Sequence, residues 1–238
     1  MIDEQFSRSA ALLGDDGIER LSRARVAVFG VGGVGGYVCE ALARSGVGGL
    51  ALFDRDTVSR SNLNRQIIAL HSTVGQPKVE VMRARILDIN PAAEVETHYV
   101  FYTPENAGEF DLSRYDYIAD CIDTVGAKIE LICRARAAGV PIISAMGAGN
   151  KLDPSRFAVT DLAKTEGCPL ARVMRYELRR RGITHLPVVF SSEPSAARQA
   201  PPAEEGRRST PGSVAFVPSV MGLIMAGEIV RRLAAGEE

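Results

Sequence analysis

The fold of this chain is decided by Gly30-Val31-Gly32-Gly33-Val34-Gly35, a glycine-rich stretch that follows the apolar run Arg25–Phe29. A glycine turn between a strand and a helix is typical of nucleotide-binding folds, and the helix N-terminus then faces the phosphates. Gly30 permits the sharp turn, Gly32 lets the backbone approach the ligand, and Gly35 lets the helix pack closely on the strand. The nucleotide-binding residues predicted from this turn are Gly30, Gly32, Gly33 and Gly35.

Strand-like and helical segments alternate outward from the glycine turn, which predicts an α/β fold with a Rossmann-like, doubly wound and mostly parallel sheet. The predicted strands are Arg25–Phe29, Leu50–Phe53, Val95–Val100, Tyr117–Ala119 and Pro141–Ser144. The predicted helices are Val34–Ser45, Lys78–Ile89 and Val125–Ala138, preceded by two N-terminal helices at Ile2–Leu13 and Gly17–Arg23. We therefore expect residues 1–150 to form a nucleotide-binding domain.

Residues 151–238 are predicted to form a C-terminal α/β extension packed on the same core. A short strand near Phe157–Val159, a helix over Pro169–Arg181 and a strand over Leu186–Ser191 are followed by a proline-rich segment, Glu193–Ser213, expected to be a mobile loop. The apolar stretch Val214–Val230 closes the chain. Pro218, Ser219, two glycines and Glu228 interrupt that stretch, so we expect a buried helix rather than a membrane span.

Composition limits the possible partners and the compartment. Lys and Arg number 28 against 29 Asp and Glu, so any contact with nucleic acid must come from a local basic patch. The four cysteines form no C-x-x-C pair and no signal peptide is recognisable. These features predict a cytoplasmic, reduced protein without structural zinc.

Polar residues after the second predicted strand indicate which nucleotide binds. Asp54 ends that strand about 20 residues beyond the glycine turn, where a carboxylate accepts hydrogen bonds from ribose hydroxyls. A triphosphate carries more charge than a glycine turn can satisfy, and Arg65 and Lys78 supply the extra cations. The phosphate-binding residues predicted from this segment are Asn62, Arg65, Gln66 and Lys78. Together with the turn, they favour ATP over a dinucleotide.

Asp123 follows the predicted strand Tyr117–Ala119 and therefore lies at the carboxyl edge of the sheet, where ligands bind. A carboxylate there can hold Mg²⁺ against the phosphates, and it can equally cap the helix that follows. Asp120 is a weaker candidate for the same role. We assign the catalytic charges to Arg65, Lys78 and Asp123, with Asp123 as the metal ligand.

These residues resemble the ubiquitin-activating-enzyme-like superfamily, which includes the adenylating enzymes of molybdopterin and thiamine biosynthesis. The resemblance covers about Phe6 to Gly149 and implies that the glycine turn, Asp54, the Asn62–Gln66 segment, Lys78 and Asp123 bind ATP and Mg²⁺. It also implies that Arg8 reaches the ATP of a partner subunit, and hence a homodimer. An ordinary exposed helical arginine is the alternative for Arg8.

The second half of the chain narrows the resemblance to one branch. Carrier-protein-activating members of the superfamily usually carry two zinc-binding C-x-x-C pairs, which this chain lacks. The segment from Thr160 through Ser192 resembles the bacterial tRNA threonylcarbamoyladenosine dehydratases, and the motifs that carry the resemblance are Asp161-Leu162-Ala163-Lys164-Thr165, Pro169-Leu170-Ala171-Arg172 and Val188-Val189-Phe190-Ser191-Ser192-Glu193. The resemblance implies ATP-dependent dehydration of threonylcarbamoyladenosine in tRNA, with tRNA as partner.

The predicted helix Pro169–Arg181 offers a surface for that partner. Leu170, Val173, Met174 and Leu178 are expected on its core-facing stripe, with Arg172, Arg175 and Arg179 opposite. Together with Arg180, Arg181, Arg207 and Arg208, the arginines can contact RNA phosphates or form a solvated helix face.

Three other functions are also compatible with these sequence features. One is adenylation of a ubiquitin-like sulfur-carrier protein, which would use the same ATP site. A second is a non-catalytic scaffold with sulfur-transfer proteins as partners, although the ATP-binding residues are intact. An NAD-dependent dehydrogenase is the most distant, because no catalytic His-Asp-Arg set is recognisable.

Overall fold

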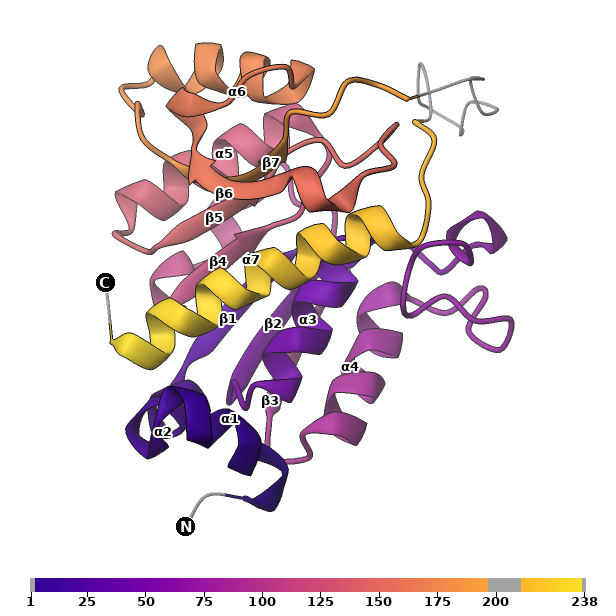
Figure 1. Ribbon diagram of the computed structural model, residues 1–238, viewed down its shortest axis with the longest axis vertical. Helices are drawn as coiled ribbons and strands as arrows, with labels where there is room; N and C mark the ends of the chain where they lie inside the picture. Colours follow the sequence, from indigo (N-terminus) through magenta and orange to yellow (C-terminus); the bar gives the residue numbers. More distant parts are fainter. Residues whose placement is uncertain (1–2, 197–210, 237–238) are drawn as a thin grey trace.

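The computed structural model describes residues 3–196 and 211–236 and is built on one seven-stranded sheet with the strand order β3-β2-β1-β4-β5-β7-β6 (Figure 1). Every neighbouring pair is parallel except β6 and β7, which are antiparallel. The predicted α/β, doubly wound and mostly parallel fold is therefore confirmed.

The elements follow the predicted order along the chain. The strands are β1 (Arg25–Phe29), β2 (Gly49–Phe53), β3 (Glu94–His98), β4 (Tyr117–Asp120), β5 (Ile142–Ala145), β6 (Phe157–Asp161) and β7 (Pro187–Ser191). The α-helices are α1 (Ser7–Leu13), α2 (Asp15–Arg23), α3 (Gly35–Arg44), α4 (Lys78–Ile89), α5 (Val125–Ala137), α6 (Pro169–Arg179) and α7 (Phe216–Ala235).

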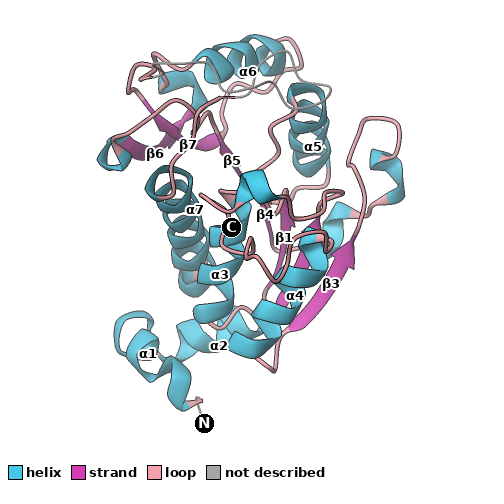
Figure 2. Ribbon diagram, turned by 90° about the vertical axis from the view of Figure 1, so that its right-hand side faces the viewer, coloured by secondary structure: helices cyan, strands magenta, loops and turns pink. Residues whose placement is uncertain are grey.

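Helices cover both faces of the sheet because its central strands are apolar on both sides. All of β2 is buried, which is typical of a parallel strand between two helical layers. Val26 and Val28 of β1 pack in one cluster with α3, α4 and α7, whereas Ala27 and Phe29 pack in a second cluster with α5 and α6. Figure 2 shows α5 across the sheet from α7.

The closing helix α7 crosses the molecule beside α3 and ends over the N-terminal helices (Figure 1). Val217, Met221, Met225 and Ile229 are fully buried along its inner face. Its last turn is tied to α2, because Arg20 Nε donates a hydrogen bond of 2.7 Å to the Ala234 carbonyl. The prediction of a buried C-terminal helix is confirmed, and none of the described helices has the length and apolarity needed to span a membrane.

The structure differs from the prediction at the end of the third strand and on the core-facing side of α6. The third strand ends at His98 rather than Val100. The His98 carbonyl accepts the last hydrogen bond of the ladder, from Asp54 N–H, and it also accepts a hydrogen bond from Val100 N–H, so the chain turns away from the sheet after His98. The core-facing stripe of α6 runs through Ala171, Met174 and Leu178, so Val173 is exposed.

Candidate nucleotide-binding site

The site lies where the strand order reverses, between β1 and β4, at the carboxyl ends of the parallel strands. This reversal is the position at which open α/β sheets bind their ligands. A cavity of about 620 Å³ opens there, a volume within the ordinary range for a small-molecule site. The predicted residues that line it are Gly30, Gly32, Gly33, Asp54, Asn62, Arg65, Gln66, Lys78 and Asp123.

The glycine turn has the geometry predicted for it. Gly30 has a φ of +90°, and a Cβ there would stand 2.8 Å from the Cys121 carbonyl oxygen. A Cβ on Gly35 would lie only 1.8 Å from the Gly30 carbonyl oxygen, so the start of α3 lies directly against the turn. At Gly32 the nearest atom would be Gln66 Nε2 at 3.8 Å, which leaves the backbone open to a ligand.

Asp54 is held at the floor of the cavity by two backbone donors. Val31 N–H donates to Asp54 Oδ2 at 2.7 Å and Asp56 N–H donates to Oδ1 at 2.8 Å. Each carboxylate oxygen keeps a second lone pair, so the group can still accept ribose hydroxyls. Burial raises the pKa of Asp54 above its usual range, although nearby Lys78 opposes that shift.

A short 3-10 helix, Arg60–Asn62, orients the predicted phosphate-binding residues of this segment. Asn62 Oδ1 accepts the Ser59 N–H at 3.1 Å, which fixes the side chain, while Arg65 Nη1 donates to the Ser61 carbonyl at 2.8 Å. Gln66 is buried, and its Oε1 has no hydrogen-bond partner among the described residues. A buried amide oxygen without a partner is costly, so this site fits a ligand that supplies a donor or bound water.

Lys78 begins α4 and brings a cation to the cavity from a buried position. Its side chain is 6% exposed, and Nζ lies 2.8 Å from Asp56 Oδ2. Asp56, at 54% exposure, can shift toward solvent more easily than the lysine can. The ammonium is therefore held at the wall of the cavity, with Asp56 as its counterion.

The two aspartates that follow β4 have different surroundings. Asp123 lines the cavity just before α5, whose N-cap is Thr124. Asp120 is fully buried in an ion pair with Lys128 and does not line the cavity, so the weaker metal candidate is excluded. Within residues 3–196 and 211–236 no group of three or more His, Cys, Asp or Glu is placed to hold a metal ion.

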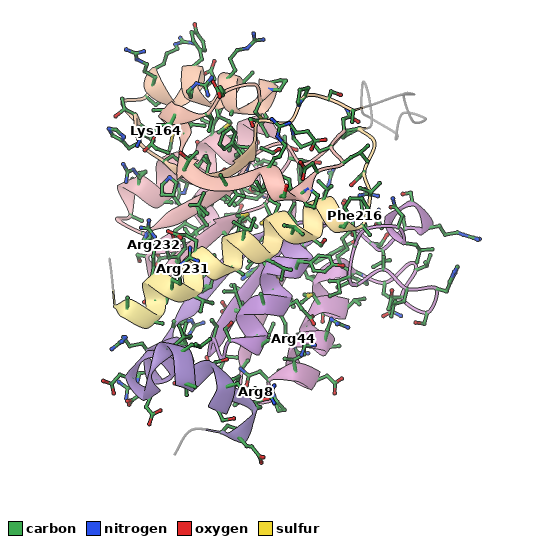
Figure 3. The ribbon with its side chains drawn as sticks, viewed as in Figure 1. Arg8, Arg44, Lys164, Phe216, Arg231 and Arg232 are labelled. Atoms are coloured by element: carbon green, nitrogen blue, oxygen red, sulfur yellow. The ribbon has the colours of Figure 1, made fainter. Side chains whose placement is uncertain are left out.

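Two predicted residues lie outside the lining of the cavity. Gly35 lies against the Gly30 carbonyl at the start of α3 and does not line the cavity. Arg8 lies on α1 with its side chain exposed (Figure 3), at the end of the molecule that carries the N-terminal helices. It does not reach the cavity of its own chain, and its role across a dimer stays a prediction.

Sequence reasoning missed several lining residues. Arg55 stacks over Phe101 with 3.9 Å from Cζ to the ring centroid, and Tyr102 is buried beside them, which raises its pKa. The signal in the sequence was the aromatic pair Phe101-Tyr102, which directly follows the predicted strand Val95–Val100.

Asn150 clamps another part of the rim. It has a left-handed φ of 58°, its Oδ1 accepts the Gly212 N–H at 2.6 Å, and its carbonyl accepts the Ala196 N–H at 2.7 Å. Both described ends of the predicted loop Glu193–Ser213 are thereby fastened to one residue, while residues 197–210 lie outside the described chain. The clamp places Pro211 and Ser213 on the rim of the cavity.

The sheet order, the glycine turn and the cationic cavity define a nucleotide-binding protein of the Rossmann-like class. The chain belongs to the ThiF family, whose model matches residues 6–238.

Three comparisons place it within that family. The tRNA threonylcarbamoyladenosine dehydratase of Bacillus subtilis is 47% identical over 239 residues, covering 96% of this chain and 94% of the relative. The crystal structure of E. coli tRNA N6-threonylcarbamoyladenosine dehydratase in complex with ATP is 34% identical, with a TM-score of 0.89 over 99% of this chain and 98% of that one. A sulfur carrier protein adenylyltransferase of Thermus thermophilus is 30% identical over 227 residues, 93% of this chain and 73% of the relative.

Proposed function

We propose that this protein is an ATP-dependent dehydratase that cyclises threonylcarbamoyladenosine in tRNA. The observation that carries the proposal is the cationic cavity at the switch point, which Arg65 and Lys78 line together with Gly32 of the glycine turn. The identity to the dehydratases over nearly the whole chain, higher than to the adenylyltransferase, supports the choice of substrate.

The proposed reaction begins with the threonyl carboxylate of the modified nucleoside. One carboxylate oxygen attacks a phosphorus of ATP and displaces either pyrophosphate or ADP, giving a mixed anhydride. The neighbouring ureido group then attacks the activated carbonyl and expels the phosphate-bearing group, so that ring closure costs the nucleoside one water in total. Arg65 and Lys78 neutralise the charge that develops on the phosphates, and Asp54 holds the ribose.

Four further features are predicted to accompany this reaction. Asp123 would hold Mg²⁺, which would supply further charge neutralisation. A homodimer would bring Arg8 to the partner's cavity. We also expect a cytoplasmic location, and sulfur-transfer proteins are possible partners.

Modified nucleosides from cells test the proposal. In the absence of the gene, digested tRNA should contain threonylcarbamoyladenosine heavier by one water than the product in wild-type cells. An Arg65→Ala allele should give the same profile, and a wild-type allele should restore the lighter nucleoside. An unchanged profile would contradict the dehydratase and favour adenylation of a sulfur-carrier protein, the function named for the Thermus relative.

A further inference from the structure

The outward face of α6 carries a row of exposed side chains that the ATP site does not use. Arg172, Tyr176, Arg179 and Arg180 are all exposed, and their spacing of four, seven and eight residues places them on one side of the helix. We infer that this face binds the phosphate backbone of the tRNA beside the nucleoside held in the cavity. The inference rests on the proposed function, because it takes tRNA as the substrate.

Charge on this face is strongly one-sided. A shallow hollow beside α6 is lined by Arg172, Arg175, Tyr176, Arg179, Arg180 and His185, together with four uncharged residues. Four of these described residues are arginines and none is acidic. Since the chain as a whole has a net charge of −1, attraction to a polyanion has to come from such a local surface.

The arginines differ in how far the protein itself uses them. Arg175 is half-buried and donates to the Thr165 carbonyl at 2.7 Å, so it fastens α6 to the preceding loop. Arg180 lies 3.9 Å from the Glu177 carboxylate, which binds Arg181 more closely at 2.7 Å. Arg172 and Arg179 form no ion pair with any residue in the described part of the chain. Their guanidinium groups are therefore available to phosphate oxygens.

Tyr176 gives the surface a feature that a simple solvated helix does not need. It is a large aromatic side chain with 62% of its surface exposed, and Arg180 Cζ lies 5.6 Å from its ring centroid. Unpaired RNA bases stack on exposed aromatic rings and on guanidinium planes. An aromatic ring among arginines matches a single-stranded segment of RNA better than a small anion.

The helix leads directly from the ATP cavity to this surface. Leu170 in the first turn of α6 lines the cavity, and a rise of about 1.5 Å per residue puts Arg179 about 14 Å further along. A few nucleotides of unpaired RNA can span that length. Lys164, labelled in Figure 3 at the α6 end of the molecule, adds a cation beyond the hollow.

A triple variant, Arg172→Gln, Arg179→Gln and Arg180→Gln, tests the inference against a control with the same loss of charge, Arg23→Gln, Arg83→Gln and Arg231→Gln. The probe is purified tRNA carrying threonylcarbamoyladenosine, titrated at several salt concentrations. The α6 variant should lose at least about 10-fold in affinity, and its slope of log affinity against log salt should fall by about three. The control and the wild type should behave alike.

A further variant tests the stacking role separately. Tyr176→Ala should weaken binding by about 5-fold or more, whereas Tyr176→Phe should bind as the wild type does. Calorimetry with ATP shows whether each variant keeps its cavity, and we expect unchanged ATP affinity throughout.

Two outcomes would overturn the inference: an α6 variant with wild-type tRNA affinity and salt slope, or equal loss of ATP and tRNA affinity. Failure of the proposed function looks different, because the wild type would then leave threonylcarbamoyladenosine unchanged in the presence of ATP.

Discussion

Lys128 Nζ lies 2.7 Å from Asp120 Oδ2, and neither side chain has any exposed surface. Ser144 Oγ donates to the same carboxylate oxygen at 2.6 Å, so the pair joins the end of β4 to α5 and β5. Asp120 Oδ1 also accepts the Ile122 N–H at 3.2 Å. This buried cluster fixes the backbone that leads to Asp123 in the cavity.

Loss of one partner of this ion pair should destabilise the fold strongly. Lys128→Met leaves a buried carboxylate without its cation, and we expect a loss of about 3–5 kcal/mol in the free energy of unfolding. Urea denaturation measures this change, with Lys164→Met as the control for removal of an exposed lysine. A Lys128→Met protein as stable as the control would contradict the assigned role of the pair.

Two glycines of the turn should respond differently to alanine. Gly35→Ala places a Cβ 1.8 Å from the Gly30 carbonyl oxygen, so the start of α3 must move and stability should fall. Gly32→Ala meets only Gln66 Nε2 at 3.8 Å, so the protein should fold normally and bind ATP at least about 10-fold more weakly. Thermal unfolding and calorimetry with ATP measure the two effects. Equal stability losses in both variants would refute this distinction.

Asp54 should make stability depend on pH in a defined direction. Its pKa in the folded protein is raised by burial, so the folded state holds this proton more tightly than the unfolded chain does. The contribution of Asp54 is therefore fully present below the unfolded pKa of about 3.9 and is lost as pH rises through the folded value. The stability of the wild type relative to Asp54→Asn should fall over that window in urea titrations. If the stability of the wild type relative to Asp54→Asn increased with pH over that window, the prediction would be contradicted.

The Asn150 clamp should affect ATP binding from the rim. Asn150→Gly keeps the left-handed backbone but removes the acceptor for the Gly212 N–H, so the KM for ATP should rise while stability changes little. Asn150→Ala should show the same rise and an added loss of about 1 kcal/mol in stability from the positive φ. Steady-state kinetics measure the KM for ATP, and urea denaturation measures the free energy of unfolding. A wild-type KM in Asn150→Gly would show that the clamp does not position the rim.

The sequence predicted those parts of the site that follow strand ends. Gly30 and Asp54 come directly after β1 and β2, and Asp123 comes three residues after the last residue of β4. Parallel strands bring their carboxyl ends to one edge of the sheet. The Asn150 clamp and the Lys128–Asp120 pair were not predictable, because each joins residues whose contact depends on the finished packing. The exposure of Val173 was missed for a similar reason, since Ala171 and Val173 differ too little in apolarity for the pattern to choose between their faces.

Dehydration of tRNA by the purified protein is the most direct test of the proposed function. Incubation with ATP, Mg²⁺ and tRNA carrying threonylcarbamoyladenosine, followed by digestion and mass spectrometry, should show a nucleoside lighter by one water only when ATP is present. Arg65→Ala should slow this step about 100-fold or more while tRNA affinity stays close to that of the wild type. A nucleoside of unchanged mass from the wild-type protein, or equal losses of rate and tRNA affinity in Arg65→Ala, would contradict the proposed reaction.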